Sequence, residues 1–141
     1  FFGEPKEIFA MVDKISNLKM SSDDNAFLML RMKNNMLINL GFDLISKPTE
    51  CKINVRGSNG SLIWDRDEHK IKYYSGRTKK WKILKYSKKD FLNMYKIQAK
   101  HFIESIIKRK KPIIDINDAL KTQEIIDKAF VSQKTGKLIK I

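Results

Sequence analysis

The sequence contains one cysteine among its 141 residues, together with three prolines and two histidines. A single thiol, Cys51, cannot form a disulfide within the chain, which favours a reducing compartment such as the cytoplasm. Cys51 falls on the apolar side of a strand pattern, so we expect a buried structural thiol. No apolar run approaches the about 20 residues that span a membrane. No signal-peptide pattern is present. The chain starts with Phe1 instead of methionine, which favours a segment of a longer protein.

The sequence also has few residue patterns that are typical of metal sites, phosphate-binding loops or catalytic sites. His69 and His101 have no cysteine or histidine neighbours at metal-ligand spacing, so we expect no metal site. Gly57 and Gly60 separate two strand patterns and do not open a helix, so they do not form a phosphate-binding loop. Two adjacent acids in a turn, Asp23 and Asp24, could act as an acid–base pair, but solvated turn acids are commoner. We therefore predict no catalytic residue, no metal and no cofactor-binding residue within this chain.

Acidic residues are few compared with basic ones, and the net charge is +13. Residues 69–111 hold 15 of the 29 Lys and Arg residues and only two acids. Four aromatic residues in that region, Tyr73, Tyr74, Trp81 and Tyr86, could stack on bases. However, only five of the basic residues are arginine, and the chain is rich in Lys, Ile and Asn. That composition favours a general lysine bias, and we expect nucleic acid to be an unlikely partner.

The most regular pattern is a hairpin over residues 53–65. Apolar side chains alternate with polar ones on both sides of a Gly-Ser-Asn-Gly turn, which is typical of two paired strands. Alternation also predicts strands over residues 6–14, 26–32 and 36–44, where Ile8 and Leu30 face inward. Further short strands are predicted over residues 70–74 and around Trp81. In these strands we expect Ile71, Tyr73, Trp81 and Ile83 on the inner face.

Two helices are predicted after these strands. The first follows Ser87 and Asp90, which form a capping-box pattern, and ends before Pro112. Its apolar stripe is Phe91, Tyr95, Gln98–Ala99, Phe102 and Ile106. The second starts at Asp115 and ends at Gly136, which suits a left-handed cap. Its predicted stripe is Ala119–Leu120, Ile126 and Phe130, and residues 137–141 are predicted as a last strand.

These elements predict one α+β domain over residues 1–141, with a largely antiparallel open sheet and two C-terminal helices packed on one face. The other face mixes polar and apolar side chains, so it is either solvated or packed against a partner subunit or ligand. Its predicted members are Asn39, Asp43, Asn54, Arg56, Ser61 and Lys72, with Phe27, Met29 and Ile63.

The order of these motifs resembles the C-terminal half of the family of glucose-fructose oxidoreductase and inositol dehydrogenase (Gfo/Idh/MocA). The resemblance covers essentially the whole chain, and its most specific element is the hairpin over residues 53–65. Gly3-Glu-Pro5 is similar to the family's start of this domain, and Asp23 or Asp24 ahead of the Asn34–Asn35 turn resembles its acid–strand–turn–strand segment. The helix pair is matched by Tyr95, Gln98, Phe102, Ile106, Pro112, Asp115, Ala119, Ser132 and Gly136.

The resemblance implies that a Rossmann domain, absent from this sequence, binds NAD or NADP and supplies the catalytic Lys, Asp and His. This chain would then form part of a sugar or polyol pocket and the contact between subunits, as a homo-oligomer. Tyr95 matches a helix start that can face the substrate in the family, although core packing is the commoner role. Asn39, Asp43 and Arg56 are candidates for the pocket or the interface.

We therefore expect the substrate-side and oligomerisation domain of an NAD(P)-dependent oxidoreductase acting on a sugar, polyol or related hydroxy compound. The fragment alone is expected to be inactive. Two alternatives remain open: a free-standing basic module that binds nucleic acid, and a purely structural dimerisation domain. The sequence determines neither the substrate nor the choice between NAD and NADP.

Overall fold

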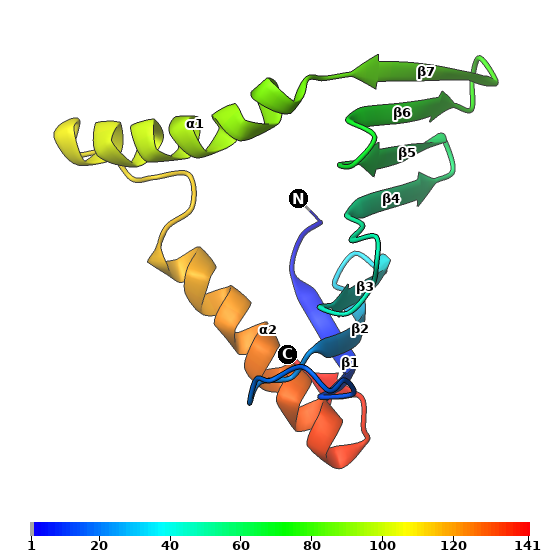
Figure 1. The fold of residues 1–141 in the computed structure, drawn as a ribbon, viewed down its shortest axis with the longest axis vertical. Helices are drawn as coiled ribbons and strands as arrows, with labels where there is room; N and C mark the ends of the chain where they lie inside the picture. Colours follow the sequence, from blue (N-terminus) through cyan, green and yellow to red (C-terminus); the bar gives the residue numbers. More distant parts are fainter. Residues whose placement is uncertain (1) are drawn as a thin grey trace. The chain divides into compact units, whose positions relative to one another are not determined.

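The computed structural model describes residues 2–141 and combines two helices with antiparallel strands, which confirms the predicted α+β class (Figure 1). The strands divide between two four-stranded sheets, where the sequence predicted one. The contacts also divide the chain into two compact units: one runs up to Ser46 and resumes at Ile113–Ile141, and the other is Lys47–Pro112. In chain order the elements are β1 Pro5–Asp13, β2 Asn25–Met32, β3 Leu37–Asp43, β4 Lys52–Gly57, β5 Gly60–Asp65, β6 Lys70–Ser75, β7 Lys80–Lys85, α1 Lys88–Ile107, α2 Ile116–Thr135 and β8 Ile139–Lys140.

The first unit is a sheet in the order β3-β2-β1-β8 with α2 packed on one face. Alternation along the strands places Ile8 and Ala10 of β1 and Leu30 and Met32 of β2 on the helix side, where all four are buried. Ala129 of α2 completes this core. The predicted inward positions of β1 and β2 are therefore confirmed.

The stripe predicted for α2 is wrong by about one residue. Leu120, Ile126 and Phe130 are exposed, whereas Ala129 and Ser132 are buried. Ile125 also packs against the core. Apolar residues occupy adjacent positions along α2, so periodicity alone fits two faces of the helix. Ser132 lies on the buried face of α2, where its hydroxyl is hydrogen-bonded. Because serine is polar, a pattern of apolar residues does not identify this face.

The helix ends agree with the predicted signals. Ser87 and Asp90 form a capping box at the start of α1, and Asp115 and Asp118 form one at the start of α2. Each box satisfies backbone N–H groups that have no partner within the helix. Gly136 ends α2 in the left-handed conformation, with φ of 65°.

The second unit contains the sheet β4-β5-β6-β7. The predicted central hairpin is confirmed: β4 pairs with β5 from Lys52 opposite Asp65 to Gly57 opposite Gly60. Gly60 lies so close to β6 that a Cβ atom there would stand 2.2 Å from the carbonyl oxygen of Tyr74. Backbone packing therefore requires glycine at this position.

The predicted facing of β7 is wrong. Ile71 of β6 lies opposite Leu84, and Tyr74 lies opposite Trp81. Trp81 and Ile83 therefore lie on one face of the sheet, and Ile71 and Tyr73 lie on the other. The adjacent apolar residues Ile83 and Leu84 allow either phase of alternation. The register of the β6–β7 hairpin fixes the phase, because a one-residue shift exchanges the two faces of a strand.

The predicted apolar stripe of α1 is exposed within this chain, so its expected burial is wrong. Tyr95, Phe102 and Ile106 are each about three-fifths exposed, at 59%, 60% and 61%. Ser105 is the one buried residue of α1 in the described part of the chain. The stripe satisfies the helical period but has no surface of its own unit to cover it. Among the described residues, no helix is long and apolar enough to cross a membrane.

Candidate functional site

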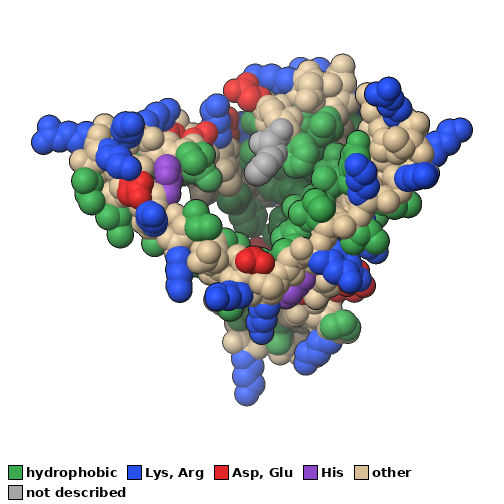
Figure 2. Space-filling view, turned by 90° about the horizontal axis from the view of Figure 1, so that it is seen from above, with side chains coloured by type: hydrophobic (Ala, Val, Ile, Leu, Met, Phe, Trp, Pro, Cys, Tyr) green, Lys and Arg blue, Asp and Glu red, His purple; other side chains and the backbone are tan. Residues whose placement is uncertain are grey.

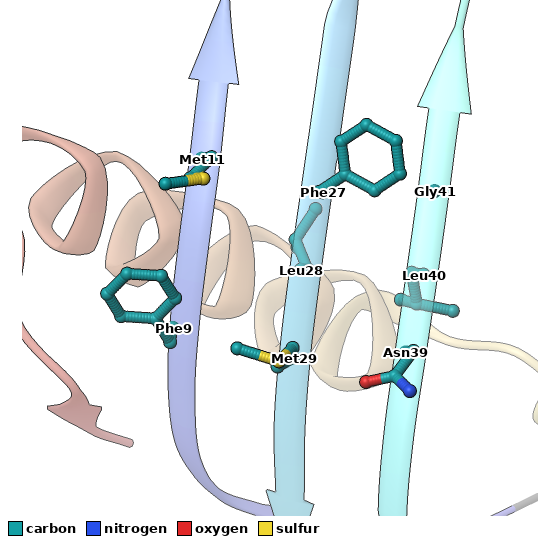
Figure 3. Close-up of a pocket in the computed structure, with 8 residues that line it drawn as sticks. All are labelled: Phe9, Met11, Phe27, Leu28, Met29, Asn39, Leu40 and Gly41. Carbon is teal, nitrogen blue, oxygen red and sulfur yellow. The ribbon is translucent and has the colours of Figure 1, made fainter.

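A hollow of about 350 Å³ lies on the face of the first sheet opposite α2 (Figure 3). We call the side chains Phe9, Met11, Phe27, Met29 and Asn39 the open face. Figure 3 shows them projecting from β1, β2 and β3, with α2 behind the strands. Met11, Phe27 and Met29 are 63%, 60% and 55% exposed, which is unusual for neighbouring large apolar residues.

The register brings these side chains into two cross-strand rows. Phe9, Met29 and Asn39 form one row, and Met11, Phe27 and Gly41 form the other. The Phe27 ring lies over Gly41, where a Cβ atom would be 3.1 Å from the ring carbon Cε1. The Phe27 ring therefore packs directly against the backbone of Gly41, which has no side chain to prevent this contact.

The chemistry of the hollow is that of a binding surface. Four of the open-face side chains are apolar, and the amide of Asn39 is the polar group among them. An amide can donate and accept hydrogen bonds but does not titrate or act as a base near neutral pH. The hollow can therefore hold an apolar surface, or the apolar face of a hydroxylated molecule, without performing chemistry on it.

Asp43 lies on β3 four residues beyond Asn39, at the strand end. Its Oδ1 accepts the backbone N–H of Ile45 at 2.9 Å, and its Oδ2 accepts the Ser46 hydroxyl at 2.8 Å. The backbone N–H of Ser46 is the main cause of a lowered pKa of the Asp43 carboxyl, and the Ser46 hydroxyl adds to it. The carboxylate oxygens of this candidate are thus used in the turn that follows β3.

The other two candidates lie in the second unit. Arg56 is exposed on β4, opposite Ser61 of β5, and Tyr95 is exposed on the first half of α1. The structure therefore brings together Asn39 and Asp43 on one strand, and places Arg56 and Tyr95 on separate elements of the other unit. The roles predicted for all four residues remain predictions.

Two of the residues considered for chemistry, Asp24 and His69, have structural partners. Asp24 is buried and accepts the backbone N–H groups of Ile15 and Ser16 and the Ser16 hydroxyl, with Lys14 Nζ at 4.0 Å. His69 stacks on Tyr86 with 5.4 Å between ring centroids. In residues 2–141 no three His, Cys, Asp or Glu side chains gather in a group that could hold a metal. Cys51 is half-buried, whereas the sequence predicted a buried residue.

The prediction of the open face from the sequence missed Phe9 and Met11. The signal was present, because alternation had already placed Phe9 and Met11 opposite the inward Ile8. What the sequence did not provide is the strand order, which sets β1 beside β2 and joins their outer side chains in one surface.

Comparison with known proteins places the chain in a family. The family model described as "Oxidoreductase family, C-terminal alpha/beta domain" matches residues 1–141. No curated protein matches the sequence.

Solved structures share the fold at low sequence identity. Levoglucosan dehydrogenase, in a complex with NADH and levoglucosan, has a TM-score of 0.83 at 12% identity, over 98% of this chain and 45% of that one. Aldose-aldose oxidoreductase from Caulobacter crescentus, complexed with glycerol, has a TM-score of 0.81 at 18% identity, over 99% of this chain and 42% of that one. An oxidoreductase from Agrobacterium radiobacter, in a complex with NAD+, L-tartaric acid and magnesium, has a TM-score of 0.78 at 16% identity, over 99% and 44%.

The chain thus spans less than half the length of each of these proteins, and at these identities the likeness shows the fold. The match of the family model over the entire sequence also shows the family, in agreement with the motifs from Gly3 to Gly136. The chain belongs to the Gfo/Idh/MocA oxidoreductase family, of which it is the C-terminal domain.

Proposed function

We propose that this chain is the substrate-side and oligomerisation domain of an NAD(P)-dependent oxidoreductase that acts on a sugar, polyol or related hydroxy compound. The observation that carries the proposal is the match of the family model to residues 1–141. Two of the similar structures are described as complexes with levoglucosan and with glycerol, both hydroxy compounds, which supports the substrate class. The lone cysteine supports a cytoplasmic location.

The residues of this chain do not fit a dinucleotide. A pyrophosphate needs a glycine-rich turn that opens a helix, and here Gly57 and Gly60 close a hairpin between β4 and β5. We therefore assign NAD or NADP, and the chemical step, to a separate Rossmann domain of the same protein.

The open face is proposed as the contact with a second copy of the chain. Its side chains are large, apolar and exposed, and a flat sheet face suits face-to-face packing at about 10 Å between sheets. A contact of this kind buries Met11, Phe27 and Met29 in both copies at once. Asn39, at the margin of the same face, either joins this contact or reaches a substrate.

Activity of the complete protein tests the proposal. The native gene should be expressed in full and assayed with NAD and NADP against a panel of sugars and polyols. We expect turnover by the complete protein and none by the 141-residue chain alone. Turnover of a polyol by the isolated chain with NAD contradicts the proposal, as does a complete protein that turns over none of the panel.

Three substitutions in the complete enzyme distinguish a pocket wall from a purely structural domain. Asn39→Ala, Arg56→Ala and Tyr95→Phe should each be measured for substrate KM and for oligomeric state. A raised KM with the oligomer intact identifies a residue of the pocket. Loss of the oligomer with KM unchanged identifies the interface, and supports a structural dimerisation domain that does not contact substrate.

A further inference from the structure

The net positive charge of the protein arises from one of its two units. Residues 47–112 carry 19 Lys and Arg and six Asp and Glu, whereas the remaining residues carry ten of each. A general lysine bias would raise the charge of both units alike. The excess of basic over acidic residues is therefore specific to residues 47–112, and a lysine bias of the whole sequence does not explain it.

Much of this charge lies in the segment from Arg77 to Lys89. It contains seven Lys and Arg residues and no acid. Within the described residues, no hydrogen bond or ion pair engages their side chains, which belong to Arg77, Lys79, Lys80, Lys82, Lys85, Lys88 and Lys89. Figure 2 views the side where Figure 1 draws β7 and α1, and shows many Lys and Arg side chains but few Asp or Glu.

The acids of this unit do little to offset that charge. Asp65 pairs with Lys52 at 3.7 Å, Glu68 with Lys70 at 3.2 Å, and Glu104 with Lys108 at 2.9 Å. Asp67 pairs with Arg66, and Asp90 caps α1. None of these acids pairs with a basic side chain of residues 77–89, so the positive charge of that segment is not offset by a contact within the described residues.

An exposed aromatic side chain lies within this basic segment. β7 is an edge strand with every residue exposed, and Trp81 is 51% exposed. Its indole contacts the Tyr74 ring on one side, with centroids 5.3 Å apart and planes at 52°. Lys80 and Lys82 point to the opposite face of the strand, while Lys85 shares the face of Trp81.

We propose that the β6–β7 hairpin and β7 bind single-stranded nucleic acid. Lysines on both faces of the edge strand would follow the phosphate backbone, and the free side of Trp81 would stack on a base, as on surfaces that bind single strands without sequence preference. Lysine on an edge strand also prevents pairing with another sheet. That role explains neither the exposed tryptophan nor the lysines at 79, 88 and 89, which lie outside the strand.

Fluorescence anisotropy with a labelled oligodeoxythymidylate of about 20 nucleotides tests the proposal, using the 141-residue chain. We expect binding at low salt, with an affinity that falls steeply as salt is added. Changing Lys79, Lys80, Lys82 and Lys85 together to Gln should reduce the salt slope by roughly 0.7 for each phosphate that is no longer neutralised. The matched control changes Lys19, Lys134, Lys137 and Lys140 to Gln, which removes the same charge from the other unit.

Trp81 separates nucleic acid from other polyanions. In a Trp64→Phe variant Trp81 is the remaining tryptophan of the chain. We expect the oligonucleotide to quench its fluorescence, and polyphosphate to leave it unchanged. Trp81→Ala should weaken binding by about tenfold, and Trp81→Phe should restore most of it. Four results overturn the proposal: no binding at low salt, equal weakening in the control variant, no effect of Trp81→Ala, and equal affinity for polyphosphate or anionic vesicles.

Discussion

The hydroxyl of Ser132 joins the last helix to the edge of the first sheet. It accepts the backbone N–H of Ala10 at 3.0 Å and donates to the carbonyl of Lys137 at 2.7 Å. Next to it, Gln133 Oε1 accepts the N–H of Val12 at 3.0 Å. β8 pairs with β1 at Glu7 and Ile8, so the side chains of α2 continue the hydrogen bonding along β1 beyond the first residue of β8.

This relationship predicts a large effect of Ser132→Ala. The substitution leaves a buried N–H group without an acceptor, which costs about 1–3 kcal/mol of unfolding free energy. Chemical denaturation measures the loss. Gln133→Ala is the matched control, because the bond from Val12 is exposed and should be worth less than about 1 kcal/mol. Equal losses in the two variants would contradict the role assigned to burial.

Acid sensitivity is predicted for the loop held by Asp24. The Ser16 hydroxyl is the main cause of a lowered pKa of the Asp24 carboxyl, and the backbone N–H of Ile15 adds to it. Because the folded pKa lies below the unfolded value of about 3.9, ionised Asp24 stabilises the fold above about pH 4. That stabilisation is lost as the pH falls through the folded pKa.

Asp24→Asn should therefore lower Tm at pH 7 and flatten the dependence of Tm on pH below about 4. Thermal denaturation followed by circular dichroism across that range is the measurement. The exposed neighbour Asp23 provides the control, since Asp23→Asn removes the same charge beside the same loop. A Tm that keeps its full acid dependence in Asp24→Asn would show that other carboxyls cause it.

The two glycines of the central hairpin should differ in their tolerance of alanine. A Cβ at Gly60 would stand 2.2 Å from the Tyr74 carbonyl oxygen, whereas at Gly57 the nearest atom is 3.8 Å away. We expect Gly60→Ala to destabilise the protein by about 2 kcal/mol or more, and Gly57→Ala by less than about 1 kcal/mol. Denaturation of both variants under the same conditions checks the difference, and similar values would contradict the close approach of β5 and β6.

Self-association through the open face is predicted to depend on Phe27 and Met29. Both are more than half exposed, so changing them together to Ser should cost the monomer about 1 kcal/mol or less while removing the apolar contact. Sedimentation velocity should show a shift to monomer. The control changes Ile116 and Leu120 of α2 to Ser, because these residues are also more than half exposed but lie outside the open face. An oligomer that survives in the Phe27 and Met29 variant would place the interface elsewhere.

Local patterns in the sequence predicted most elements, because strand alternation and capping signals are properties of neighbouring residues. Ile8 and Leu30 face inward as their alternation requires, and Asp115 and Gly136 mark the two ends of α2. Two of the errors fall where adjacent apolar residues permit two solutions, at Ile83–Leu84 and Ile125–Ile126. Tertiary contacts selected one of the two in each case.

The candidate site was harder to predict, since it depends on strand order. Asn39, Phe27 and Met29 were expected on one open face, and they do share it. Arg56 was expected beside them, but its strand belongs to the second sheet. A single sequence contains no direct signal of where one sheet ends and the next begins.

The first unit is assembled from the two ends of the chain, with residues 47–112 inserted between them. Its strands β1, β2 and β3 are therefore synthesised long before α2, which supplies Ala129 and Ser132 to their core. The second sheet is built from successive hairpins and needs only neighbouring residues. We expect the inserted unit to fold first during synthesis, while the apolar side of β1–β3 waits for the last helix to emerge from the ribosome. Limited proteolysis of chains ending before α2 would show this order as early protection confined to residues 47–112.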